Sequence, residues 1–213
     1  MKTNKIITVI LACTFLFSCS STRLASSWKA ENSNTKIYHN IMVWGILTEK
    51  DSLLRGKMET HLVNDLAGKG YHAVSSFSVF GQGNYKKISE KEIVEKFKNT
   101  GVDAVITMVL LDKSKEEVYV APSIINNPPA LGEVNKYYSA TYDKVFSPGY
   151  YVTTTNYFWE SNVFEVSENK LIYSVRTKSF DPSSTDMLAH ENGLTILKDM
   201  IRKKVILDRV KEE

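Results

Sequence analysis

The sequence predicts an α/β fold with a mixed sheet, in which a parallel β-α-β-α-β first half is followed by antiparallel strands and a C-terminal helix. Three features predict this fold class. Apolar residues recur at helical spacing between strand-like segments, one continuous apolar run has the composition of a buried strand, and two β-branched, aromatic segments flank a short turn. At 213 residues the chain is long enough for one domain with a sizeable core.

The first strand and the first helix are expected between residues 37 and 69. Residues 37–47 are apolar and β-branched, and the expected strand covers 42–47. Residues 51–69 are the expected helix, because one apolar stripe recurs at every fourth position: Leu54, Met58, Leu62 and Leu66. Gly68 and Gly70 are expected to close this helix, since glycine is favoured at helix C-termini.

Two further strands and a second helix complete the parallel half. Residues 73–80 alternate between polar and apolar and predict a strand. Ser89 and Glu92 have the spacing of a capping box, which predicts a helix that ends at Gly101. Residues 102–111 form a continuous apolar run, typical of a central strand buried on both faces. The short connections favour parallel neighbours with right-handed crossovers.

The pattern changes after this strand. Residues 116–120 predict a short separate strand. An irregular stretch is expected over 121–149, because four of the five prolines lie there: Pro122, Pro128, Pro129 and Pro148. Residues 150–180 predict an antiparallel hairpin with its turn at 167–170. A last helix is expected to run past Val205.

The N-terminus predicts a lipoprotein signal peptide. Lys2 and Lys5 precede an apolar run that is too short for a transmembrane helix of about 20 residues. Leu16-Phe17-Ser18-Cys19 fits the motif that precedes acylated cysteines, so we expect residues 1–18 to be removed and Cys19 to carry lipid. The alternatives are an ordinary cleaved signal, a retained anchor, and acylation of Cys13.

Lipidation changes how the remaining chain is interpreted. The mature chain keeps no thiol for a disulfide. Of 27 Lys and Arg residues, loss of Lys2 and Lys5 leaves 25 against 24 Asp and Glu, which gives no indication of nucleic-acid binding. Ser20 is not the aspartate that commonly retains lipoproteins in the inner membrane, so the outer membrane is favoured. We expect residues 19–35, rich in Ser, Thr and Asn, to be a lipidated tether and 36–213 to be the single domain.

Short motifs along nearly the whole chain resemble those of small Gram-negative envelope lipoproteins with a domain of unknown function. The motifs are Cys19-Ser-Ser-Thr22, Ser26-Ser-Trp28, Arg55 with Glu59, Gly70-Tyr71, Gly101-Val-Asp-Ala-Val105, and the hairpin from Phe164 to Tyr173. More distantly, the chain is similar to the N-terminal half of TolB and to the activator lipoproteins of penicillin-binding proteins. The resemblance implies an envelope address and function by binding other envelope proteins, with no catalytic residue to carry over.

The sequence offers no convincing catalytic or metal-binding constellation, so we expect no enzyme activity and no cofactor. No serine lies in a nucleophile motif. The histidines lack the spacing of metal ligands: His39, His61, His72 and His190. The Gly81-Gln-Gly83 segment is expected to be a flexible loop rather than a phosphate-binding one. Arg55 and Glu59, four residues apart on one helix, predict a surface ion pair.

The feature that points most directly to a binding surface is aromatic. Nine Tyr, Phe and Trp residues lie between residues 137 and 159. Tyrosine combines a large, stiff contact area with a hydroxyl group and therefore suits recognition surfaces. The candidate binding surface consists of Tyr137, Tyr138, Tyr142, Tyr150 and Tyr151. The alternative is that these tyrosines pack a long loop onto the sheet, in which case their side chains would be buried.

These features favour an envelope lipoprotein that is held on the membrane by its lipid and acts as a protein-binding or scaffolding module. Its partner would be another envelope protein, met on the periplasmic side of the outer membrane. A second class is a small-ligand-binding protein or an enzyme with a pocket at the carboxyl ends of the parallel strands. Export to the cell surface is a third, less favoured because no acidic run follows Cys19.

Overall fold

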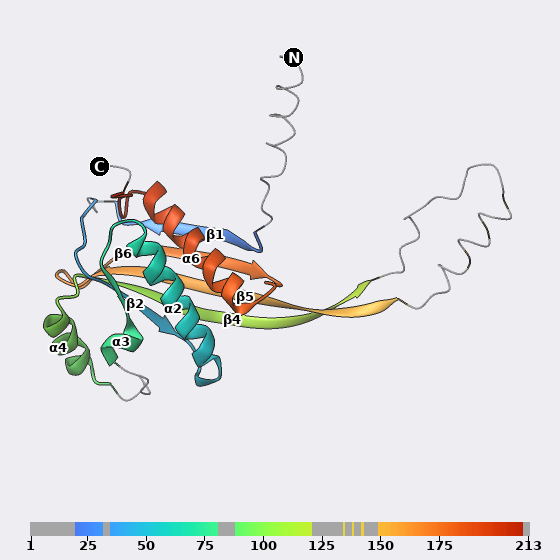
Figure 1. The fold of residues 1–213 in the computed structure, drawn as a ribbon, viewed down its shortest axis with the longest axis horizontal. Coiled ribbons are helices and arrows are strands. Elements are labelled where there is room, and N and C mark those ends of the chain that lie inside the picture. The colour runs from blue at the N-terminus through green and yellow to red at the C-terminus, as the bar shows by residue number, and fades with distance from the viewer. Residues whose placement is uncertain are drawn as a thin grey trace, which may run out of the picture.

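A computed structural model describes residues 20–31, 35–80, 88–120 and 149–210, together with the single residues Val134, Tyr138 and Tyr142. Its centre is a six-stranded sheet in the order β1-β6-β5-β4-β2-β3 (Figure 1). β2 is parallel to β3 and β4, and all other neighbours are antiparallel. The strands are β1 (Thr22–Lys29), β2 (Ile41–Ile46), β3 (Ala73–Ser75), β4 (Ala104–Val120), β5 (Tyr150–Glu165) and β6 (Lys170–Phe180). The predicted fold class is confirmed.

Two long helices, α2 (Ser52–Ala67) and α6 (Thr185–Arg202), lie side by side on one face of the sheet, here called the inner face (Figure 1). The predicted stripe of Leu54, Met58, Leu62 and Leu66 is buried beneath α2. It meets inward side chains of the central strands, among them Met108, Trp159 and Tyr173. The main core therefore forms between the apolar side chains on one face of the helices and the alternate side chains of the strands that point to the inner face.

Two shorter helices, α3 (Ser76–Phe80) and α4 (Glu90–Thr100), belong to the opposite, outer face at its β2 side. There Trp44 of β2 packs against Phe80 and Phe97, with ring centroids 5.4 and 6.5 Å apart. The predicted capping box is present: the Glu92 N–H donates to Ser89 Oγ, and the Ser89 N–H donates to Glu92 Oε2 (2.8 Å). Outward side chains of β6 and β1 stay exposed on the other half of this face.

Three element boundaries differ from the predictions. The expected strand over 73–80 stops at Ser75, because Ser76 Oγ and the Phe77 N–H donate to the Glu59 carboxylate and start the short helix α3. The expected separate strand over 116–120 is the end of β4, which continues through a bulge after Leu110. The last helix ends at Arg202 rather than beyond Val205, and Val205 is buried past its end.

The predicted tether over residues 19–35 is wrong, because Thr22–Lys29 form β1 at the edge of the sheet. The Ser and Thr residues whose composition suggested a linker make hydrogen bonds to the folded domain. Thr22 Oγ1 shares a hydrogen bond with Ser179 Oγ (2.7 Å), and the Thr22 N–H donates to Glu191 Oε2 of α6 (3.0 Å). The folded domain therefore begins at residue 22, only three residues after Cys19. Cys19, the predicted signal peptide and the Gly81-Gln-Gly83 segment lie outside the described residues.

Candidate functional site

The candidate site is a two-stranded arm that extends the sheet beyond its helices. The last residue of β2 pairs with Val109, and the last residue of β6 pairs with Asn156. Beyond these points, among the residues that the structure describes, β4 and β5 pair only with each other, through six cross-strand pairs from Lys115–Thr155 to Val120–Tyr150. Residues 115–120 and 150–155 are called the arm, which in Figure 1 projects from the body as a long ribbon.

Apolar and aromatic side chains are exposed on the arm. Tyr119 and Tyr151 lie directly opposite each other, with ring centroids 5.3 Å apart, and are 53% and 69% exposed. Val118, Val152 and Tyr150 are also exposed, on the other side of the ribbon. A two-stranded hairpin is marginal in water without a third strand or a covering helix. Exposed apolar groups on such a ribbon are typical of an interaction surface.

Both backbone edges of the arm are available for pairing. Within the described part of the chain, no third strand continues along either edge between residues 115 and 120 or between 150 and 154. At the root, the Asp181 N–H donates to the Thr155 carbonyl and closes that edge (2.8 Å). Unpaired strand edges offer a row of N–H and C=O groups to an incoming strand.

The root of the arm is fastened to the body by a charged contact. Lys113 Nζ donates to Asp51 Oδ1 (2.8 Å), at the end of the 3-10 helix η2 (Glu49–Asp51), and lies 5.6 Å from the centre of the Tyr157 ring. The hydrogen bond from Lys113 lowers the pKa of Asp51, and the same bond raises the pKa of Lys113. Both groups are therefore charged at neutral pH, and they hold the arm where it leaves the body.

The structure places four of the five predicted tyrosines. Tyr150 and Tyr151 lie on the arm, and Tyr138 and Tyr142 are exposed, with their rings 5.4 Å apart. Tyr137 lies outside the described residues. The exposure of these four side chains disfavours the interpretation that they pack a loop onto the sheet.

The later aromatics of the cluster behave differently, because Tyr157 and Trp159 are core residues. Sequence reasoning missed Tyr119 and Val118, which were assigned to a short separate strand. The apolar triplet of residues 118–120, placed directly before the proline-rich stretch, is the pattern that could have identified them.

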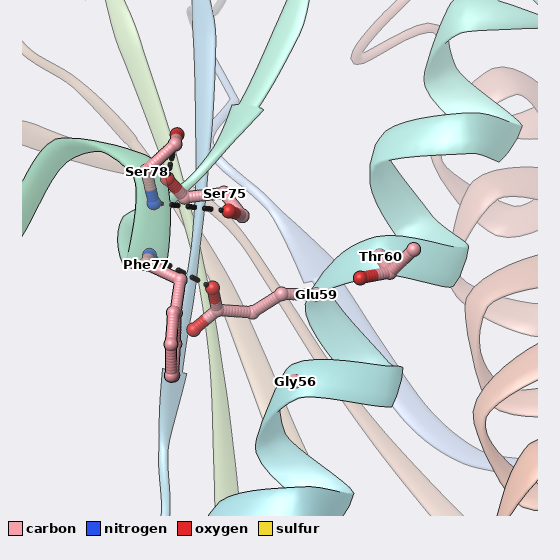
Figure 2. A pocket seen from close by; sticks show the side chains of 6 residues that line it. All are labelled: Gly56, Glu59, Thr60, Ser75, Phe77 and Ser78. Atoms are coloured by element: carbon pink, nitrogen blue, oxygen red, sulfur yellow. Dashed lines mark hydrogen bonds between the residues drawn. The ribbon is translucent and has the colours of Figure 1, made fainter. Parts of the chain in front are cut away.

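A hollow of about 400 Å³ lies between α2 and the carboxyl end of β3, where the alternative function would need a pocket. It is lined by Gly56, Glu59, Thr60, Ser75, Phe77 and Ser78 (Figure 2). Figure 2 shows Glu59 reaching from α2 toward the Phe77 N–H, and Ser75 and Ser78 hydrogen-bonded to each other.

Glu59 holds three elements together at the edge of this hollow. Its carboxylate accepts hydrogen bonds from the Gly45 N–H (2.9 Å), Ser76 Oγ (2.7 Å) and the Phe77 N–H (3.3 Å). Burial raises the pKa of Glu59, and these three donors act in the opposite direction. A side chain at Gly45 would meet Arg55 Cγ at 2.6 Å, so glycine is required for this close approach of α2 to β2.

The predicted surface ion pair between Arg55 and Glu59 is therefore wrong in its location. Glu59 is fully buried and Arg55 is 9% exposed, with its guanidinium stacked 4.8 Å from the centre of the Phe77 ring. The spacing was interpreted as a solvated helix pair, but the residues lie on the buried face of α2. Their arrangement is that of a structural tie between α2, β2 and α3.

Asp103 and two of the histidines contact neighbouring elements of the fold. Asp103 accepts hydrogen bonds from the backbone N–H groups of His39 (2.6 Å) and Asn40 (3.0 Å). His61 and His190 stand 5.8 Å apart, ring centre to ring centre. Among the residues that the structure describes, no three His, Cys, Asp or Glu side chains are grouped closely enough to hold a metal ion. No helix in the same ranges is long and apolar enough to cross a membrane.

Comparisons with known proteins give structural likeness only. No protein-family model matches the sequence, and no curated protein matches it. The lipoprotein GNA1162 from Neisseria meningitidis shares 11% identity at a TM-score of 0.44, over 77% of this chain and 99% of that one. The PelC dodecamer from Paraburkholderia phytofirmans shares 11% at 0.39, over 83% and 95%. A putative neuraminyllactose-binding hemagglutinin homolog from Helicobacter pylori shares 13% at 0.33, over 87% and 90%. Likeness at this level supports no inference about what this chain binds.

Proposed function

We propose that this chain is an envelope lipoprotein, anchored through Cys19, that binds another envelope protein with its arm. The observation that carries the proposal is the pair Tyr119–Tyr151, which is exposed on a ribbon that no helix covers among the described residues. Two other aromatic residues further along β5, Tyr157 and Trp159, are buried. Exposure on the arm thus follows from its position outside the body.

The chemistry of the arm suits a protein partner. Tyrosines on a stiff strand give large contact areas at low cost in conformational entropy, and their hydroxyl groups add directional hydrogen bonds. The free edges beside them can accept an extended segment by strand addition, in which backbone hydrogen bonds give affinity and neighbouring side chains give specificity. We therefore infer that the partner contributes an extended segment along the β4 or β5 edge.

The lipid anchor and the location at the outer membrane are inferred from the sequence of residues 1–20. Cys19 in its acylation motif supports attachment by lipid, and Ser20 supports the outer membrane. On the periplasmic side of that membrane, the arm would meet other outer-membrane proteins or proteins of the periplasm. The protein then works as a binding module without catalysis or cofactor.

Photocrosslinking in cells tests the binding site. A photoreactive residue at Tyr151 is expected to capture one protein, and the double change Tyr119→Ala with Val118→Ser is expected to abolish that capture. Val210, 60% exposed near the C-terminus, is the matched control position and should not capture the same protein. Equal capture from both positions, or no protein captured at Tyr151, would exclude the arm as the binding site.

The hollow beside Glu59 supports a second candidate function, binding of a small polar molecule through Thr60, Ser75 and Ser78. A Cβ atom at Gly56 would meet no other atom within 4 Å, so Gly56→Leu is the change chosen to place a side chain in the hollow. Native mass spectrometry of the purified protein would reveal a small molecule that the Gly56→Leu variant loses. No bound molecule in either form would leave the arm as the functional site.

A further inference from the structure

The half of the outer face that α3 and α4 leave open carries cations and aromatic rings. On β6, Arg176, Lys178 and Phe180 alternate with Val175, Thr177 and Ser179, which are buried on the inner face. Thr177 Oγ1 bonds Asn192 of α6, which fixes the inner side of the strand. Two residues of β1 also lie on the outer face, because Arg23 pairs with Lys178 and Trp28 pairs with Ser174. Arg23, Trp28, Arg176, Lys178 and Phe180 are called the outer patch.

The charge of the outer patch is unbalanced. Arg176 is paired with Glu160, to which its Nε donates (2.8 Å), and this bond lowers the pKa of Glu160. Arg23 and Lys178 face each other across β1 and β6, and neither makes an ion pair with a described residue. Like charges directly opposite in a sheet are destabilising. An anionic partner would relieve this repulsion.

The aromatic part of the outer patch is exposed beside these cations. Trp28 is 49% and Phe180 is 53% exposed, although both belong to regular strands. Lys178 Nζ lies 5.5 Å from the centre of the Phe158 ring, so its apolar stem covers part of the sheet. Tryptophan together with Arg and Lys is the combination that favours the interface between a bilayer and water.

We propose that the outer patch docks on the surface of the bilayer and binds its anionic headgroups, so that the sheet lies along the membrane. The proposal rests on the lipidation of Cys19 in the proposed function. Only Ser20 and Ser21 separate Cys19 from Thr22, the first residue of β1, which allows a distance of about 10 Å at most. β1 is itself about 27 Å long, and Trp28 stands near its far end. The anchor therefore holds the N-terminal end of β1, together with Arg23 and the paired end of β6, close to the lipid.

Quenching of tryptophan fluorescence by lipids brominated near the headgroup tests the docking. The acylated mature protein would be reconstituted in phosphatidylcholine vesicles with and without phosphatidylglycerol. Trp159 is buried and Trp44 is packed between Phe80 and Phe97, so Trp28 should account for the quenching and Trp28→Phe should remove it. Arg23→Gln and Lys178→Gln should each lower the docked-to-undocked ratio about fivefold in anionic vesicles.

The control is Lys198→Gln, an exposed lysine of α6 on the opposite side of the sheet, which should leave quenching unchanged. If the protein floats with the vesicles but the wild type is quenched no more than Trp28→Phe, or if phosphatidylglycerol has no effect, docking is excluded while the anchor stands. If the protein does not float and carries no acyl chain, both the lipoprotein function and the docking are excluded.

Discussion

Strand β5 runs through two environments, and the contrast between them separates the buried core from the exposed arm. From residue 156 to 165 the strand is bonded on both edges, by β4 and β6, and Trp159 and Val163 are buried under the helices. From 150 to 154 its only partner strand in the described chain is β4, and Tyr150 and Tyr151 are exposed. Both parts are rich in aromatic residues, so neighbours rather than residue type decide their burial.

The same contrast appears along β4, which begins with five buried residues and ends with exposed ones. Burial of apolar surface is the main stabilising contribution to folding, so the free energy of unfolding should reside in the body. The arm, whose side chains are mostly exposed, should contribute little to stability. Changes in matched residues of body and arm can therefore confirm or overturn this division.

The largest expected difference lies between Trp159→Ala and Tyr151→Ala, two aromatic truncations in one strand. Trp159 is fully buried, so its loss should lower the free energy of unfolding by about 3–5 kcal/mol. Tyr151→Ala should change it by no more than about 0.5 kcal/mol, because the side chain is 69% exposed. Urea denaturation measures both. A loss of several kcal/mol in Tyr151→Ala would mean that the arm is part of the core.

A polar version of this comparison uses Glu59 in the body and Glu117 in the arm. Glu59→Ala leaves three donors without their acceptor and should cost about 1–3 kcal/mol for each buried donor that water cannot reach. Glu59→Gln keeps one acceptor oxygen and should lose less. Glu117→Ala should be nearly neutral, since Glu117 is exposed. Equal unfolding midpoints for Glu59→Ala and Glu117→Ala would contradict the tie between α2, β2 and α3.

The sequence predicted the body well and the arm poorly. The stripe of α2, the capping box of α4 and the apolar start of β4 are local patterns that report burial directly, and all three elements formed where expected. The length of β4 was not predictable in this way, because the polar residues from Asp112 to Lys115, between the two predicted strands, resemble a loop. They form a strand because β5 pairs with each of them, and those partners are 40 to 46 residues away in the sequence.

The N-terminal strand was missed for a related reason. β1 is an edge strand whose side chains are mostly exposed, so it lacks the alternation that marks a half-buried strand. Pairing with β6 and the contact of Thr22 with Glu191 hold it in place. At the candidate site, composition indicated the tyrosines, but only the structure shows that Tyr151 faces Tyr119 on the arm.

Substitution of Asp65 should have a smaller effect on the free energy of unfolding, and should raise it rather than lower it. Its Oδ2 is buried on α2 without a hydrogen-bond partner among the described residues, and a side chain at Gly193 of α6 would meet it at 2.9 Å. Burial raises the pKa of Asp65, while His190 and His61 act in the opposite direction. The folded protein therefore binds a proton on the Asp65 carboxyl more tightly than the unfolded chain does. The stability that this protonation contributes is lost as pH rises through the folded-state pKa.

Asp65→Asn removes that loss and should stabilise the protein at neutral pH by on the order of 1 kcal/mol, because a buried amide costs less than a buried charge. The advantage over the wild type should disappear as the pH falls and the wild-type carboxyl becomes protonated. Thermal unfolding at several pH values measures this. Glu116→Gln, in the exposed arm, should show no such pH dependence, and a stability gain that persists in acid would point to a different cause.

The joint between body and arm gives the smallest effect and the sharpest test of their independence. Lys113→Gln breaks the contact with Asp51, which is partly exposed, so the free energy of unfolding should fall by less than about 1 kcal/mol. Because the folded-state pKa of Asp51 is lowered, this contribution is present at neutral pH and is lost as pH falls through that pKa. Backbone hydrogen exchange should quicken from residue 115 to 120 and stay unchanged in α2. Lys115→Gln, a neighbour without an ion pair to a described residue, is the control, and slow exchange retained in Lys113→Gln would show that strand pairing alone holds the arm in place.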